Sequence, residues 1–154
     1  MNEPLVEDNE EGAQLWVDRG ARRYAPGELL TGGYRLAEWR EEGLAAIEFS
    51  LLWYTAGQGE EDFFVHYFER HKAAVLPMRH DETPYRFKVV MPASPLSYDG
   101  RIVKVCWAAR LRGIFRSGKQ RVVEIPFWLS LPEDHPPAIT PTSAISNGEA
   151  ARRR

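Results

Sequence analysis

Two segments of the chain, joined by a turn-rich connection, alternate between apolar and polar side chains. The apolar members of residues 85–91 and 103–111 fall on odd-numbered positions, namely Tyr85, Phe87, Val89, Met91, Val103, Val105, Trp107, Ala109 and Leu111. A period of two is typical of a strand with one face on a core and the other in water. We therefore expect two half-buried strands here, with the side chain of Trp107 pointing inward.

The rest of the chain extends this pattern to a whole domain. Seven strands are predicted, at residues 13–18, 28–38, 44–55, 62–70, 85–91, 101–112 and 121–129. Turn-forming residues separate them, and no segment carries a convincing helical stripe. Residues 35–47 come nearest to one, but Gly43 interrupts it. The sequence thus predicts an all-β fold, an antiparallel, immunoglobulin-like two-sheet β-sandwich of about seven to eight strands.

The two ends differ in composition from the centre. Residues 1–12 are acidic and residues 132–154 are rich in Pro, Ser, Thr and Ala and end in three Arg. Neither end has enough apolar surface to offset the entropy of ordering, so both are predicted to be disordered tails around a folded domain at residues 13–131. The N-terminus has no secretory signal and no run is apolar enough to span a membrane, which makes a cytoplasmic location the expectation.

Charge is distributed unevenly along the chain. Residues 1–62 hold 14 acids and 5 bases, a net −9, whereas residues 63–154 hold 8 acids and 15 bases, a net +7. The sum, −2, is near neutral. We expect strands from the two halves to interleave, so that most of these charges cancel in space.

Several turn residues have roles that follow from their stereochemistry. Pro26 presets φ for a turn, and Gly27 supplies the positive φ that closes it. Gly100 is expected to do the same after Asp99. Pro92 cannot donate a backbone hydrogen bond, so the chain is expected to leave the sheet there. The hydroxyl of Tyr98 is expected to fold back and cap the core.

Three segments, in order, carry a resemblance to a known family. They comprise a Tyr-x-Pro-Gly-Glu turn with a later Gly (Tyr24, Pro26, Gly27, Glu28 and Gly32), the strand at residues 46–55, and a Pro-Ser-Tyr-Gly connection (Pro92, Ser97, Tyr98 and Gly100) followed by residues 103–111. Together they resemble the N-terminal domain of the arrestin-like fold family. The resemblance implies a non-enzymatic β-sandwich that binds other proteins. The chain has room for one such domain only, so the interdomain switch of two-domain arrestins does not carry over.

Residues that could support chemistry do not form a familiar constellation. His66 and His71 are five apart and are expected on opposite faces of a strand, while His80 lies in a loop, so a metal site is not predicted. No Gly-x-Ser-x-Gly elbow is present. Cys106, the single cysteine, is expected to be a small structural residue. No catalytic residue, metal or cofactor is therefore predicted, and a metal-dependent or hydrolytic enzyme is the remotest alternative.

One hairpin is the best candidate for a binding surface. It carries five bases and no acid within twelve residues at Arg110, Arg112, Arg116, Lys119 and Arg121. Such a surface attracts anions, although bases on an edge also prevent sheet-to-sheet aggregation. The near-neutral domain and the lack of an interleaved aromatic platform disfavour nucleic acid.

Two classes of function remain. The first is a protein-interaction module, an adaptor or scaffold, whose partner is an acidic or phosphorylated protein. The second is a small-ligand or anion-binding β-sandwich that uses the Arg-rich hairpin.

Overall fold

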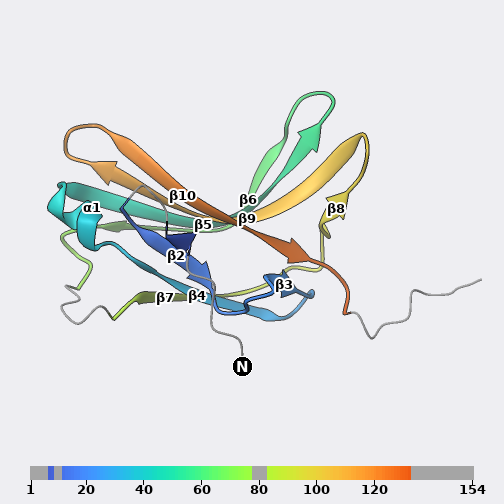
Figure 1. Ribbon diagram of the computed structural model, residues 1–154, viewed down its shortest axis with the longest axis horizontal. Coiled ribbons are helices and arrows are strands. Elements are labelled where there is room, and N and C mark those ends of the chain that lie inside the picture. Colours follow the sequence, from blue (N-terminus) through green and yellow to red (C-terminus); the bar gives the residue numbers. More distant parts are fainter. Residues whose placement is uncertain (1–6, 9–11, 78–82, 133–154) are drawn as a thin grey trace, which may run out of the picture.

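The computed structural model describes residues 7–8, 12–77 and 83–132. Two sheets pack face to face (Figure 1). In chain order the elements are β1 (Glu7–Asp8), β2 (Gln14–Val17), β3 (Arg23–Tyr24), β4 (Leu29–Arg35), α1 (Ala37–Glu41), β5 (Leu44–Gly57), β6 (Phe63–Lys72), β7 (Tyr85–Val90), β8 (Tyr98–Asp99), β9 (Val103–Phe115) and β10 (Gln120–Leu129).

The smaller sheet has the strand order β1-β2-β4-β7, and the larger has the order β3-β10-β9-β5-β6, with β8 paired to β9. All of these pairs are antiparallel except β3–β10. Strands take up 59% of the described residues and helix 4%. The predicted all-β, two-sheet sandwich is confirmed, and each of the seven predicted strands is present.

The core lies between the sheets, on the odd-numbered faces of β7 and β9. The side chains of Phe87 and Trp107 are buried, as the alternation predicted. Phe87 stacks on Phe49 of the opposite sheet with ring centroids 4.1 Å apart. Trp107 packs beside Phe127, and its indole N–H donates to the carbonyl of Pro95 at 2.8 Å. Aromatic rings thus form much of the contact between the two sheets.

The sequence did not predict helix α1. Leu36 and Trp39, three positions apart, are both buried, and Trp39 meets Phe115 edge to face. A β-carbon on Gly113 would lie 2.6 Å from the ring of Trp39, so β9 needs glycine there. The helix ends at Glu41, before Gly43, and one turn offers too few apolar positions to produce a recognisable stripe.

The predicted tails lie largely outside the described residues. Glu7 and Asp8, inside the predicted acidic tail, pair with Leu15 and Gln14 as β1. The prediction of disorder therefore does not hold for these two residues, because the edge of β2 offers them backbone partners. For the remaining residues of both tails it stays a prediction. No helix among the described residues is long and apolar enough to cross a membrane.

Two of the turn predictions need correction. Gly27 has φ +82°, as expected, but Gly100 does not have a positive φ. Glycine is required at 100 for space, because a β-carbon would lie 2.3 Å from the ring of Tyr98 and 2.6 Å from the carbonyl oxygen of Val103. Tyr98 does not cap the core and is 57% exposed. It pairs with Val105 near an end of β9. Val103, which the alternation placed inward, is also exposed there, so the inward prediction is wrong for this residue.

The connection from β7 to β8 leaves the sheet at Pro92, as predicted, and is tied to β10. The backbone N–H of Ser97 donates to the carbonyl of Leu129 at 2.7 Å. The Ser97 hydroxyl accepts from the N–H of Leu129 at 2.8 Å. Gly32, the last Gly of the early motif, allows a close approach, since a β-carbon there would lie 2.2 Å from the carbonyl oxygen of Trp16. These motif residues therefore serve packing and turn geometry.

Candidate functional site

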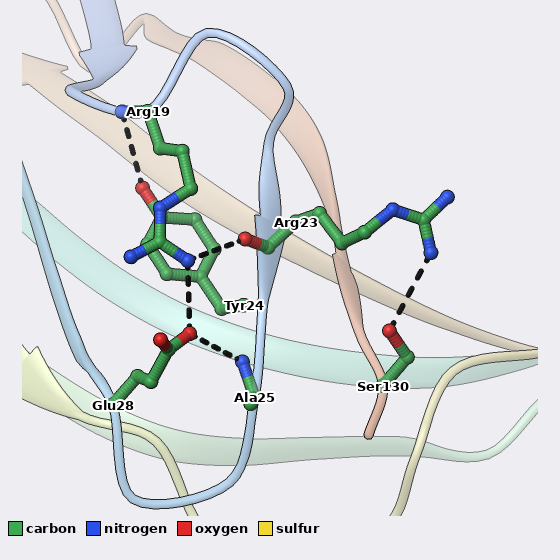
Figure 2. A network of polar contacts seen from close by, with 6 residues as sticks. All are labelled: Arg19, Arg23, Tyr24, Ala25, Glu28 and Ser130. Carbon is green, nitrogen blue, oxygen red and sulfur yellow. Dashed lines mark hydrogen bonds and ion pairs between the residues drawn. The ribbon is translucent and has the colours of Figure 1, made fainter. Parts of the chain in front are cut away.

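The early turn motif forms a polar network around Glu28 (Figure 2). The carboxylate of Glu28 accepts from the N–H of Ala25 at 2.7 Å and from the guanidinium of Arg19 at 2.8 Å. Arg19 also donates to the carbonyl of Arg23 at 2.7 Å and lies over the ring of Tyr24. The hydrogen bond from Arg19 holds the pKa of the Glu28 carboxyl below its usual value. This network closes the Pro26–Gly27 turn and is structural.

A shallow groove beside this network is a weaker candidate for a ligand site. Its lining includes Asp18, Arg19, Tyr24 and Thr31. Asp18 accepts from the hydroxyl of Thr31 at 2.7 Å and pairs with Arg86. The charged groups that line the groove are therefore already engaged within the protein.

The Arg-rich hairpin is largely neutralised. Arg110 pairs with Glu124 at 2.6 Å, Arg112 with Glu48 at 2.8 Å, and Arg121 with Glu42 at 2.8 Å. Glu124 follows Arg121 by three residues on β10, whereas Glu42 and Glu48 come from a segment more than sixty residues before the hairpin. These three arginines are therefore neutralised by acids that lie outside residues 110–121, and binding of a partner by the hairpin stays a prediction.

The remaining two bases of the hairpin, Arg116 and Lys119, lie at its tip, and neither forms an ion pair with another described residue. More widely, acids of the first half of the chain pair with bases of the second, including Glu48 with Arg70. The expectation that the uneven charges cancel in space is therefore supported at these pairs.

The outer face of the larger sheet is apolar over two rows of neighbouring strands. We call these seven residues the outer patch: Pro126, Ala108, Leu52 and Val65 in one row, and Cys106, Tyr54 and Phe63 in the next. They alternate with core residues such as Leu51 and Trp107, so they face away from the smaller sheet. Beyond the patch lies a charged row in which Glu48 contacts both Arg70 and Arg112.

Strand β6 forms one edge of the larger sheet, and its first half is strongly apolar. Phe63 is 51% exposed, Val65 48% and Phe68 53%. Among the described residues only β5 pairs with β6, so the other side of its backbone is open. The second half of β6 is charged and includes Arg70 and Lys72. We call residues 63–68 the open edge.

A bulge in β6 alters the placement of the histidines. The register shifts between Leu51 and Leu52, and His66 turns toward the smaller sheet, with its Nε2 3.1 Å from the carbonyl oxygen of Val90. His71 lies 3.4 Å from Glu69 and pairs with the core residue Ile47. The two histidines therefore do not point to opposite faces, as the residue spacing predicted. His80 lies outside the described residues. Within residues 7–8, 12–77 and 83–132 no three potential metal ligands cluster.

A hollow lies at the other end of β6, beside the tip of the hairpin. It has a volume of about 460 Å³ and is lined by Arg40, Leu44, Ala45, Lys72, Ala73, Ala74 and Arg116. Three cations therefore lie around one hollow, and only Arg116 among them was singled out from the sequence. The other two were missed because residues 40, 72 and 116 are far apart along the chain. No local sequence signal connects them.

Comparisons with known proteins give likenesses among solved structures. No protein-family model and no curated protein matches the chain. Among solved structures, the chain resembles the sporulation control protein Spo0M of Bacillus subtilis, with 12% sequence identity and a TM-score of 0.46. The match covers 86% of this chain and 51% of that protein, so the chain spans about half of its length. A likeness this distant assigns neither family nor function, and the arrestin-like resemblance of the sequence stays a prediction.

Proposed function

We propose that this protein is a non-enzymatic protein-interaction module, an adaptor or scaffold, that binds an extended segment of a partner protein along the open edge of β6. The observation that carries the proposal is the side of residues 63–68 that faces away from β5, where the backbone pairs with no described strand and apolar side chains are exposed. An added strand gains backbone hydrogen bonds from the sheet and side-chain contacts from its surface.

The position of the outer patch supports this mode of binding. Phe63 and Val65 belong both to the open edge and to the two apolar rows of the patch. A strand added beside them would extend each row by one position, and its outward side chains would pack on Phe63, Val65 and Phe68. The partner segment is therefore expected to be apolar at alternate positions and to lack charge over its central residues.

The contrast within β6 indicates which part of the strand is used. Natural edge strands are commonly protected from pairing by charged side chains. Residues 69–72 contain such charges, whereas residues 63–68 contain none apart from a titratable histidine. The unprotected half is therefore the half available to a partner.

A library of displayed random peptides of about twelve residues tests the proposal, because it samples extended segments of every composition. The full chain should select peptides that are apolar at alternate positions. Phe68→Lys should abolish their binding, because a charge on the open edge opposes strand addition. Ile102→Lys is the matched control, since Ile102 is 68% exposed and lies outside the edge.

Equal binding by both variants, with unchanged melting temperatures, would contradict the proposal. So would selection of no extended peptides. A third contrary result is a concentration-dependent dimer that Phe68→Lys disrupts, since the edge would then bind a second copy of the chain.

A second candidate function is binding of small anions. The Arg-rich hairpin alone gives it limited support, because Arg110, Arg112 and Arg121 are paired with glutamates. The specific observation in its favour is that Arg116, at the hairpin tip, lines the hollow together with Arg40 and Lys72.

A further inference from the structure

The hollow beside the hairpin tip is assembled from four separate parts of the chain. They are helix α1, the start of β5, the end of β6 with the residues after it, and the turn between β9 and β10. Figure 1 shows α1, the start of β5 and this turn together at one end of the sandwich. Lys72 ends β6 and Phe63 begins it, so the hollow and the open edge lie at opposite ends of one strand.

Backbone hydrogen bonds fix the walls of the hollow. The N–H of Arg116 donates to the carbonyl of Gly43 at 3.0 Å, which joins the hairpin tip to the turn after α1. The N–H of Ala73 donates to the carbonyl of Ala45 at 2.9 Å, which joins the end of β6 to β5. The lining is therefore held in place before any ligand arrives, which reduces the entropy cost of binding.

Arg40 is held in position without losing its charge. Its guanidinium donates to the carbonyl of Ala73 at 3.4 Å, to the carbonyl of Leu76 at 3.3 Å and to the hydroxyl of Tyr85 at 2.8 Å. All three acceptors are neutral. A guanidinium carries five N–H donors, so three hydrogen bonds orient Arg40 and leave donors for a ligand.

Among the described residues, the other two cations also have no neutralising partner. Neither Lys72 nor Arg116 forms an ion pair with a described residue, and both are exposed. In contrast, the nearby Glu42 is already paired with Arg121. Three positive charges therefore share one hollow of about 460 Å³. An anion bound between them would relieve their mutual repulsion.

We propose that this hollow binds a small phosphomonoester, with its phosphate among the side chains of Arg40, Lys72 and Arg116. The planar guanidinium group of arginine can donate two parallel hydrogen bonds to the oxygens of a phosphate, and the ammonium group of lysine adds a positive charge. The rest of the ligand lies against Leu44, Ala73 and Ala74, whose small apolar side chains suit a compact organic group. None of the described residues that line the hollow is aromatic and could stack on a base, so a nucleic-acid strand fits it less well.

This inference deepens the second candidate function and does not depend on strand binding at β6. Isothermal titration calorimetry on the full chain tests it with three probes: ribose 5-phosphate, inorganic phosphate and ribose. Ribose 5-phosphate should bind, inorganic phosphate should bind more weakly, and ribose should not bind. Affinity should rise between about pH 5 and pH 7.5, because the second phosphate proton is lost near pH 6.

Two variants of the hairpin tip make the test specific to the hollow. Arg116→Ser should weaken ribose 5-phosphate binding by at least about tenfold, since it removes a bidentate contact. Lys119→Ser removes the same charge from the same turn, but Lys119 does not line the hollow, so affinity should stay within about twofold. Unchanged melting temperatures confirm that both variants remain folded.

Three results would overturn the proposal. The first is no heat of binding with either phosphate probe. The second is an equal loss of affinity in Arg116→Ser and Lys119→Ser. This result would indicate that the general positive potential of the hairpin tip attracts the ligand and that the hollow does not bind it. The third is binding to vesicles that contain phosphatidic acid without binding to ribose 5-phosphate, which would assign the cations to a membrane surface.

Discussion

Replacing Trp107 by alanine should destabilise the protein by about 4 kcal/mol, within the range of about 3–5 kcal/mol that the cavity left by a buried Trp costs. Trp107 is 1% exposed and lies on β9, between β5 and β10 in the larger sheet. The lost N–H donor also removes the hydrogen bond to Pro95, worth about 1 kcal/mol.

Urea denaturation followed by circular dichroism measures this change. With an m-value of about 1.5 kcal/mol/M, a loss of about 4 kcal/mol lowers the midpoint by about 2.7 M. Trp107→Phe fills part of the cavity but lacks the N–H donor, so it should lose less, about 1–2 kcal/mol. An alanine variant that unfolds at the parental midpoint would refute the inward placement of Trp107.

Three other substitutions examine separate parts of the structure. Glu48→Ala should cost about 1–2 kcal/mol in low salt and less in about 1 M salt, because Glu48 pairs with Arg70 and Arg112; a loss independent of salt in urea titrations would argue against these pairs. Gly32→Ala should cost at least about 2 kcal/mol by thermal unfolding, because the new β-carbon would collide with the backbone of β2; an unaltered melting temperature would refute that close approach. Glu28 has a lowered folded pKa, so its contribution to stability is present above the unfolded value near 4.5 and is lost as pH falls through the folded pKa. Glu28→Gln should therefore show a shallower loss of stability below pH 4.5 than the parent, and parallel curves would contradict this assignment.

The sequence predicted the parts of the fold that depend on local pattern. The alternation around Phe87 and Trp107 indicated which faces are buried, because a strand's inward face repeats every second residue. The turn at Pro26 and Gly27 was also predicted correctly, since proline and glycine set the backbone angle φ directly. Helix α1 was missed because its single turn buries only Trp39, with the buried Leu36 just before it.

The features that bear on function depend on long-range contacts and were mostly invisible in the sequence. The hairpin looked strongly basic because Glu42 and Glu48 lie far from it in the chain. The bulge that reorients His66 has no residue signature. The hollow was also missed, since Arg40, Lys72 and Arg116 are brought together only by the folded sheets. The exposed residues of β6 were predicted as a strand, but the sequence did not identify it as an open edge.

The pairing of β5 with β9 has a consequence for the order in which the chain can fold. Leu44 pairs with Phe115, 71 positions later, and Gly57 pairs with Val103, 46 positions later. During synthesis, β5 and β6 are made well before the strand that must lie on the other side of β5. Until β9 emerges, the apolar side chains of β5 lack the neighbours that cover them, and closing such long loops is slow. The nascent chain therefore contains the apolar side chains of β5 before their β9 neighbours exist, and a chaperone that shields apolar segments would act most effectively at that stage.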